Sequence, residues 1–248
     1  MKNITLIFLT ALTIISCDNK RDGEEKPTLL SNALSITDNE DKGVKEILEY
    51  YGGNCKYAIG ASVSTDEGSK KYFELEMSKS DAIEKYAQII EMPASNIAYL
   101  FYRNLKDEKS NYNEIQTVII FNDATKKTFT YSVDKLELVK NKMLLVNKLV
   151  DLLKIKNFEA IKPMLDEKSS PLKYDKNDLI YNISKIDSMY GQIKEFLPYG
   201  FRFKKLENGK ELLHISGALI RDKQSNEFSV DLDPESTKDE IFILQYKL

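Results

Sequence analysis

The stretch that decides the fold is KLELVKNKMLLVNKLVDLLKIK, residues 135–156. It is the longest run of the chain in which apolar residues recur at helical spacing. These residues form two adjacent stripes: Leu138, Leu145, Leu149 and Leu152 in one, and Val139, Val146, Val150 and Leu153 in the other. So wide an apolar surface is typical of a helix that is buried from more than one side. We therefore predict one long helix here, which either joins two halves of the chain or begins the second half.

Downstream of this helix, the pattern predicts more helices and then strands. Helices are expected at 158–165 and 176–189, separated by the Ser169-Ser170-Pro171 break. Strands are expected at 192–203, 211–221, 227–233 and 240–248, with turn residues at Glu207-Asn208-Gly209 and at 223–226. Residues 135–248 are therefore predicted to be an α+β domain of order ααα-ββββ with an antiparallel sheet.

Upstream of the long helix, residues 43–134 are predicted to be a second α+β domain. A helix at 44–51 ends at Gly52-Gly53, and alternating residues at 56–64 and 70–77 predict a hairpin. Ser80 suits the N-cap of a helix, and Pro93 suits the first turn of another that reaches residue 105. Strands at 114–121 and 127–133 complete the order α-ββ-αα-ββ, again with an antiparallel sheet expected.

The N-terminus has the features of a secretory leader. Lys2 precedes an apolar run at 4–15, which is too short to cross a bilayer as a helix, since that needs about 20 residues. The run ends in Ile14-Ile15-Ser16-Cys17, which resembles the lipobox of bacterial lipoproteins. The resemblance implies that residues 1–16 are a signal peptide and that Cys17 receives acyl chains such as palmitate. A conventional cleaved signal with an incidental cysteine is the alternative.

Residues 17–42 are mostly polar and are predicted to be a flexible tether between the lipid and the folded part. The resemblance implies an anchor in the bacterial cell envelope, facing the periplasm or the cell surface. Asp18 resembles an inner-membrane retention mark, whereas the acidic pair Glu24-Glu25 resembles the surface-export signals of Bacteroidetes-type lipoproteins. The many Lys, Asn and Ile residues favour the second interpretation, so the outer membrane is preferred over the inner.

The composition excludes several classes of protein. The 248 residues carry 36 Lys+Arg and 39 Asp+Glu, and 42% of them are hydrophobic, which excludes a disordered chain and a multi-span membrane protein. A net charge of -3 gives no general attraction to a nucleic-acid backbone. One His and two Cys exclude most metal sites built from these residues and leave little for a His-dependent triad. We expect no metal, no cofactor and no nucleic-acid partner.

The C-terminal half resembles the cone-shaped, cystatin-like domains of the NTF2-like superfamily, in particular small ones of unknown function from bacterial secreted proteins and lipoproteins. The residues that carry the resemblance are Asn157-Phe158-Glu159-Ala160, Met164-Leu165-Asp166, Tyr190-Gly191-Gln192-Ile193 and Asp231-Leu232-Asp233-Pro234. They cover packing and turn positions within residues 143–248, and none is a catalytic motif. The resemblance implies a curved sheet that is closed by helices and forms a pocket.

The candidate pocket residues are His214 and Ser216, which share one face of the strand at 211–221. A functional His214 would pair with an acid such as Asp187 or Glu195, whereas the simpler interpretation is a half-exposed histidine on a sheet face. No catalytic residue is assigned.

The other candidates have simple structural explanations. Cys55 fits a small buried side chain better than a nucleophile. The acidic run at 231–235 fits a solvated turn better than a calcium loop.

The function expected from these observations is that of a non-catalytic, membrane-tethered lipoprotein with a binding or assembly role, which binds an envelope protein or a small ligand. The alternative is a small hydrolase or isomerase that uses His214 in an NTF2-like pocket.

Overall fold

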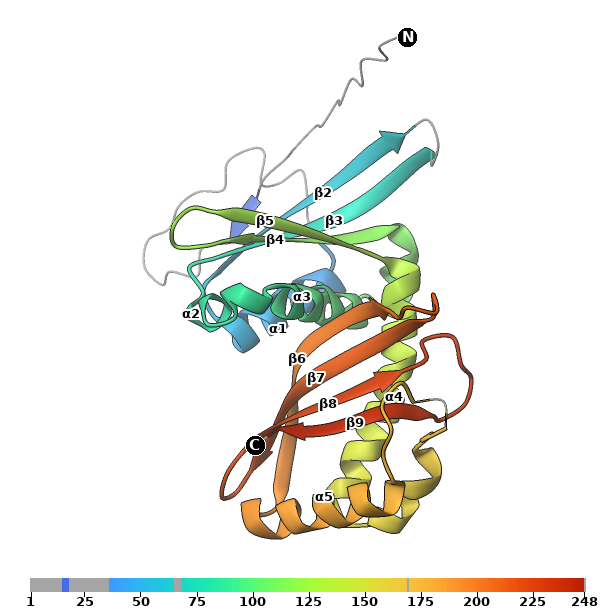
Figure 1. The fold of residues 1–248 in the computed structure, drawn as a ribbon. Coiled ribbons are helices and arrows are strands. Elements are labelled where there is room, and N and C mark those ends of the chain that lie inside the picture. Colours follow the sequence, from blue (N-terminus) through green and yellow to red (C-terminus); the bar gives the residue numbers. More distant parts are fainter. Residues whose placement is uncertain (1–14, 18–35, 65–67, 169, 248) are drawn as a thin grey trace. The chain divides into compact units, whose positions relative to one another are not determined.

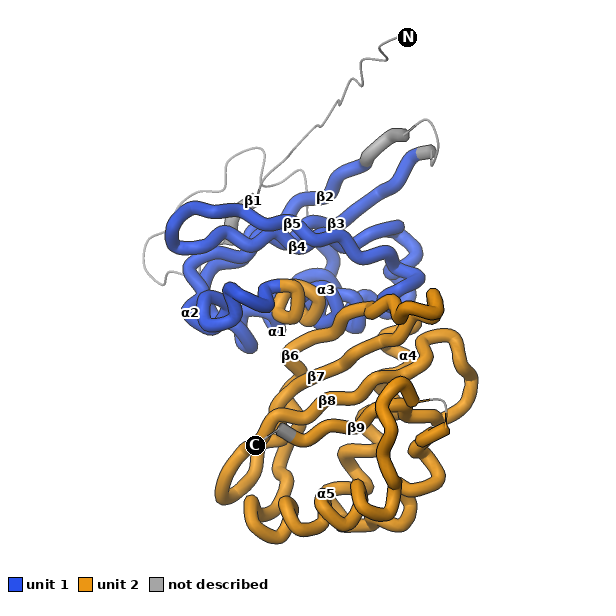
Figure 2. Tube along the Cα trace, viewed as in Figure 1, with its two compact units in different colours: residues 1–90, 97–136 blue, residues 91–96, 137–248 orange. Residues whose placement is uncertain are grey.

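The computed structural model describes residues 15–17, 36–64, 68–168 and 170–247. The chain forms two compact units, residues 1–90 with 97–136 and residues 91–96 with 137–248 (Figure 2). Most of the expected signal peptide (1–16) and tether (17–42) therefore lies outside the described residues. Cys17 is described only in its backbone, so its acylation stays a prediction.

The first unit is a mixed sheet with helices on one face (Figure 1). Its elements are β1 (Ile15–Cys17), α1 (Asp38–Tyr51), β2 (Asn54–Ser64), β3 (Gly68–Ser78), α2 (Asp81–Glu84), α3 (Glu91–Asn104), β4 (Glu114–Ile120) and β5 (Lys126–Ser132), with 3-10 helices at Ala87–Ile89 and Lys106–Asn111. The sheet order is β1-β2-β3-β4-β5, in which four long strands are joined at the β2 edge by the three-residue β1. The α+β class and the predicted element order are confirmed.

The prediction of an antiparallel sheet is wrong for this unit, because β3 and β4 pair in parallel from Tyr72↔Glu114 to Ser78↔Ile120. The chain between these two strands contains α2 and α3. A connection of this length can carry the chain back to the end of the sheet where β3 began, so the next strand runs in the same direction. Only the two hairpins, β2–β3 and β4–β5, are antiparallel among the long strands.

Helix α1 begins at Asp38, inside the segment predicted to be a tether. Its N-cap is Thr37, whose side chain accepts a hydrogen bond from the Glu40 amide at 3.2 Å. In return, the Glu40 carboxylate accepts one from the Thr37 amide at 2.9 Å. This reciprocal pair is a capping box, and it adds a first turn to the helix that apolar spacing alone predicts from Val44.

The core of the first unit lies between β3, β4 and the helices. Phe73 of β3 and Phe101 of α3 are both fully buried, and their ring centroids are 4.2 Å apart. Cys55 is also fully buried and carries a free thiol, so the prediction of a small buried side chain is confirmed. Such close-packed apolar contacts supply most of the stability of a domain of this size.

The second unit is an antiparallel sheet with helices before it in the chain (Figure 1). Its elements are α4 (Val133–Lys154), 3-10 helices at Phe158–Ala160 and Lys162–Met164, α5 (Lys176–Tyr190), β6 (Ile193–Lys205), β7 (Glu211–Arg221), β8 (Asn226–Leu232) and β9 (Ile241–Lys247). The sheet order β6-β7-β8-β9 follows the chain, and every neighbouring pair is antiparallel. The predicted long helix and the four predicted strands are confirmed.

The helix predicted over 158–165 is replaced by two 3-10 helices of three residues each. Pro163 lies within the second of them. Proline has no amide hydrogen and its ring crowds the preceding turn, so an α-helix cannot continue through it.

The two faces of the second sheet have different roles. Arg221 of β7 contacts Asp187 of α5, so this face of the sheet turns toward the helix. Alternate residues of a strand share a face, and the helix-facing set is apolar and almost fully buried: Leu213, Ile215, Leu219, Phe228, Val230, Leu232 and Leu244. His214 and Ser216 lie on the opposite face. The space next to the helices is thus filled by apolar side chains.

Candidate functional site

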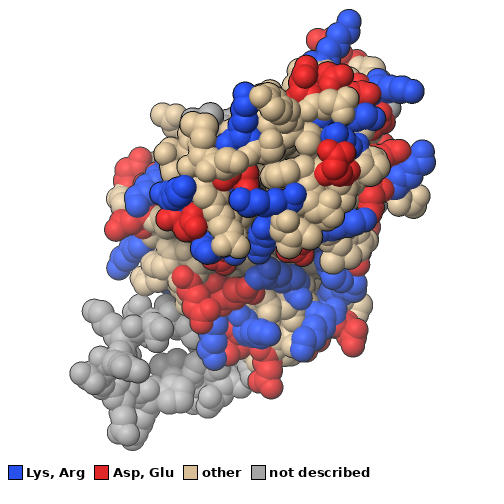
Figure 3. Space-filling view, turned by 90° about the horizontal axis from the view of Figure 1, so that it is seen from below, with Lys and Arg blue, Asp and Glu red and all other residues tan. Residues whose placement is uncertain are grey.

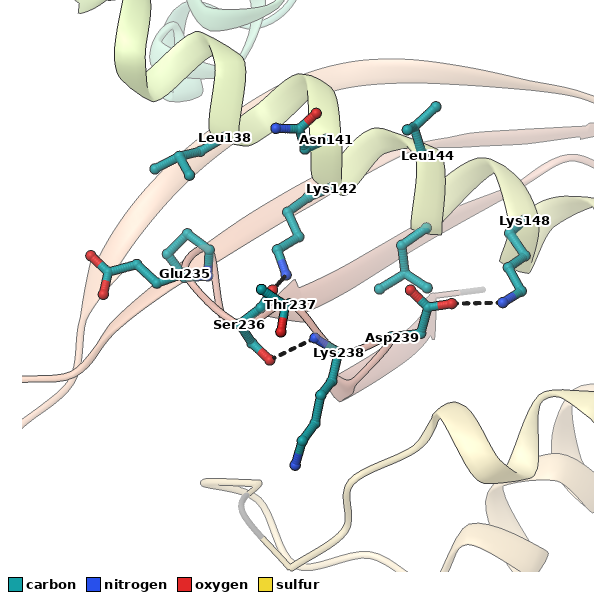
Figure 4. A pocket seen from close by; sticks show the side chains of 12 residues that line it. Leu138, Asn141, Lys142, Leu144, Lys148, Glu235, Ser236, Thr237, Lys238 and Asp239 are labelled. Carbon is teal, nitrogen blue, oxygen red and sulfur yellow. Dashed lines mark hydrogen bonds and ion pairs between the residues drawn. The ribbon is translucent and has the colours of Figure 1, made fainter.

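The main candidate site is a groove in the second unit, between α4 and the connection from β8 to β9 (Figure 4). Its volume is about 510 Å³, within the range of small-molecule sites in proteins. The lining residues from α4 are Leu138, Asn141, Lys142, Leu144, Leu145 and Lys148, and those from the connection are Pro234, Glu235, Ser236, Thr237, Lys238 and Asp239.

The helix wall of the groove follows from residue spacing on α4. Leu138, Lys142 and Leu145 are four and three residues apart and therefore lie on the same side of the helix. Leu145 is buried, whereas Leu144 beside it is 68% exposed. The exposed Leu144 gives the groove lining an apolar surface that is open to solvent.

The opposite wall is held in shape by Asp233, which directly follows β8. One oxygen of its carboxylate accepts hydrogen bonds from the amides of Glu235 and Ser236 at 3.0 and 3.3 Å, and the other oxygen contacts Lys210 at 3.0 Å. These contacts hold the pKa of Asp233 below its usual value, although burial acts in the opposite direction. Asp233 thus shapes a turn, as the simpler interpretation of this acidic run predicts.

Two lysines of α4 reach across to the connection. The Lys142 ammonium donates to the main-chain carbonyl of Ser236 at 2.5 Å, and Lys148 forms an ion pair with Asp239 at 2.6 Å. Lys142 is only 7% exposed. Burial lowers the pKa of Lys142, while the carboxylates of Asp233, Asp239 and Glu240 act in the opposite direction. The groove therefore contains a partly desolvated cation next to an apolar surface.

The second candidate is a polar cluster on the sheet face that carries His214. The Nδ1 atom of His214 contacts the carboxylate of Asp231, its cross-strand neighbour on β8. Lys204 of β6 lies 3.0 Å from the same nitrogen and 3.3 Å from an Asp231 oxygen. An ionised carboxylate only accepts hydrogen bonds, so Nδ1 donates to Asp231 and Lys204 donates to the carboxylate. The Nε2 atom of a neutral His214 is then the basic nitrogen.

Burial and charge act in opposite directions on Asp231. Burial would raise its pKa, but the hydrogen bond from His214 and the ammonium of Lys204 outweigh it, and the pKa lies below its usual value. The His214 side chain is 12% exposed. The groove on α4 has no residue of this cluster in its lining, so the two candidates are separate sites.

The acids named as possible partners of His214 lie elsewhere. Asp187 is buried on the helix-facing side, where its carboxylate contacts Arg221 at 2.6 Å. Glu195 pairs in register with Ile220 at the far part of β7. Ser216 is buried on the same face as His214 and lies opposite Ser229 of β8. The structure thus places His214 with Asp231 and Lys204.

The Arg221 cluster joins α5 to the sheet. Arg221 donates to Asn226 at 2.8 Å, to Asp187 at 2.6 Å and to the carbonyl of Gly191 at 2.7 Å, and its side chain has no exposed area. Its contacts reach the C-terminal end of α5 and the start of β8, so we interpret the cluster as structural.

The residues described in the structure contain no group of three or more His, Cys, Asp or Glu arranged to hold a metal ion. Within the same ranges, no helix is long and apolar enough to cross a membrane. On the face drawn in Figure 3, acidic and basic side chains of the described residues are interspersed.

Sequence reasoning missed Lys142 as a site residue, although a signal was present. Lys142 is four residues after Leu138 and three before Leu145, so it lies within the leucine stripe of the long helix. A lysine in an apolar stripe indicates a buried or half-buried ammonium, which needs an acceptor or a ligand.

Comparisons with known proteins add no relative. No family model, curated protein or solved structure matches the chain.

Proposed function

We propose that this protein is a lipid-anchored lipoprotein of the bacterial envelope that binds a ligand or partner protein in the groove between α4 and residues 234–239. The observation that carries the binding role is that one groove is lined both by the exposed side chain of Leu144 and by the buried side chain of Lys142. The lipobox-like sequence that ends at Cys17 supports the envelope location, with the outer membrane preferred.

The order of elements in the second unit supports an NTF2-like architecture for it. Helical segments precede four antiparallel strands that follow one another in the sheet. The interior next to the helices is apolar and filled, so the proposed binding site is the groove between α4 and the β8–β9 connection instead of the inside of a cone. An experimental structure that shows a strand order other than β6-β7-β8-β9 would contradict this assignment.

The anchor is tested by the variant Cys17→Ala. Acyl chains hold a protein on a membrane because each buried methylene contributes about 0.8 kcal/mol. We expect the wild-type protein in the membrane fraction and the variant in the soluble fraction, measured by immunoblot after fractionation. Persistent membrane association of the variant would contradict the anchor.

The binding role is tested by site-specific photo-crosslinking in intact envelopes. A benzophenone amino acid at position 144 should give a crosslinked product, because Leu144 is exposed and belongs to the groove lining. The matched control is position 155, since Ile155 is 70% exposed, lies one residue past the end of α4 and is absent from the groove lining. Equal crosslinking at 144 and 155 would contradict a specific site.

A second candidate function is a hydrolase or isomerase that uses His214 as a base. The contact between His214 and Asp231 favours it, because a carboxylate on Nδ1 fixes the tautomer and leaves Nε2 basic. If this function is correct, His214→Gln abolishes an activity found by substrate screening, while Glu227→Gln, on the same sheet face, does not. An activity unchanged in His214→Gln would exclude this role.

A further inference from the structure

The charges around Lys142 are arranged so that its ammonium faces a neutral acceptor. Each of the three nearby carboxylates contacts another lysine: Asp233 with Lys210, Asp239 with Lys148 and Glu240 with Lys238. Lys142 itself donates to a main-chain carbonyl. A partly desolvated ammonium gains more from an anion than from a carbonyl, because the attraction between two opposite charges is added to the hydrogen bond.

The remaining lining defines what can accompany an anionic group. Leu138 and Leu145 lie on the same side of α4 as Lys142, and Glu235 points away from its ammonium in Figure 4. The lining residues include no aromatic side chain, so the groove lacks the flat rings on which sugars and bases stack. A flexible apolar chain fits such an aliphatic surface better than a ring system.

We infer that the groove binds a small amphipathic carboxylate, with the acidic group on Lys142 and a short alkyl chain on Leu138 and Leu145. This inference rests on the proposed binding function and specifies its ligand class. The ion pair orients the ligand, and burial of its methylenes adds affinity in proportion to the apolar area removed from water.

The test uses the full-length chain in lipid nanodiscs and three probes of equal length: hexanoate, hexan-1-ol and hexylammonium. The rate at which an amine-reactive reagent modifies Lys142 is measured by peptide mass spectrometry, with Lys210 as the internal control. Lys210 is paired with an acid in the same region but is absent from the groove lining. We expect hexanoate alone to slow the modification of Lys142 and to leave that of Lys210 unchanged.

The matched variants are Lys142→Met and Lys210→Met, with circular dichroism to confirm that each is folded. Removal of the ammonium should weaken hexanoate binding, measured by ligand-observed NMR, by about tenfold or more, because bonds to charged groups contribute at least this factor. Lys210→Met should bind like the wild type. If Lys142→Met does not fold, Lys142→Arg replaces it, and tight binding only to the lysine form supports the inference.

The outcomes separate this inference from the proposed function. Equal protection by hexanoate and hexan-1-ol would overturn the ion pair. A crosslinked partner at position 144 without any protection by hexanoate would overturn the inference and leave the binding function standing. If neither a crosslinked product at position 144 nor protection of Lys142 by hexanoate is found, both the inference and the proposed binding function are overturned.

Discussion

At the scale of single residues, Asp231 links the His214 cluster to stability in acid. Its pKa is lower in the folded protein than its ordinary value, because His214 and Lys204 outweigh the effect of burial. A group with a depressed folded-state pKa contributes stability above its unfolded pKa and loses that contribution as the pH falls through its folded pKa. Asp231 therefore stabilises the fold at neutral pH, and this contribution is lost progressively as the pH falls below about 4.

The variant Asp231→Asn tests this linkage. At pH 7 the free energy of unfolding should fall by about 1–3 kcal/mol, since charge-assisted hydrogen bonds to His214 and Lys204 are lost. The difference from the wild type should become smaller as the pH falls from 5 to 3, because Asp231 takes up its proton at a higher pH in the unfolded state than in the folded state. Urea unfolding at pH 7, 5 and 3 measures it.

The control is Asp239→Asn, which removes a surface ion pair with both side chains 56% exposed. Its effect at pH 7 should stay below about 1 kcal/mol. A loss of stability in Asp231→Asn that does not change with pH would show that Asp231 acts through packing and not through its charge.

Residue positions on strands were predictable from alternation, but their partners were not. The face shared by His214 and Ser216 follows from a period of two along β7. The partner Asp231 follows only from the β7–β8 register, in which His214 lies opposite Asp231. That register is set by the turn after Arg221 and by the burial of one face of the sheet. The sequence alone does not show which residue of β8 then lies opposite which residue of β7. Asp187, which was named as a possible partner, lies on a helix across the opposite face.

At the scale of elements, the ion pair between Asp187 and Arg221 links α5 to the sheet. The Asp187 side chain is 3% exposed and that of Arg221 is fully buried. Removing one member of a buried pair leaves a desolvated charge, so Asp187→Ala should lower the free energy of unfolding by about 3–5 kcal/mol. Chemical denaturation followed by circular dichroism measures the change.

The double variant Asp187→Leu with Arg221→Met replaces both charges by apolar side chains. Its loss of stability should be smaller than that of Asp187→Ala, because no buried charge is left without a partner. Lys156→Ala is the matched surface control, since Lys156 contacts Asp187 at 3.4 Å but is 55% exposed. Equal losses in Asp187→Ala and Lys156→Ala would contradict a dominant buried pair.

Elements that rely on local signals were predicted well, and those that depend on distant pairing were not. Both hairpins of the first unit and the meander of the second follow from alternation and turn residues. The parallel pairing of β3 and β4 depends on how α2 and α3 pack, which no local pattern reports. The first turn of α1 is an intermediate case, because its capping box of Thr37 and Glu40 can be read from the sequence but lies within the segment that was predicted to be a tether.

At the scale of the whole molecule, the two compact units each contain their own apolar core. A unit with its own core can unfold separately when its stability falls well below that of the other. Asp187→Ala weakens the second unit alone, whereas Cys55 is fully buried in the first. Cys55 therefore reports on the first unit while the second is destabilised.

The prediction is that Asp187→Ala divides thermal unfolding into two steps. In a Cys17→Ala background, Cys55 is the one cysteine of the chain, since the sequence contains two. Circular dichroism should show an early loss of structure while Cys55 stays protected from a thiol reagent, and labelling should begin only in the later step. With wild-type Asp187 the two midpoints should lie closer together. Labelling of Cys55 in the early step would show that the units unfold as one, and that the helices α3 and α4, which contribute residues to both, couple their stabilities.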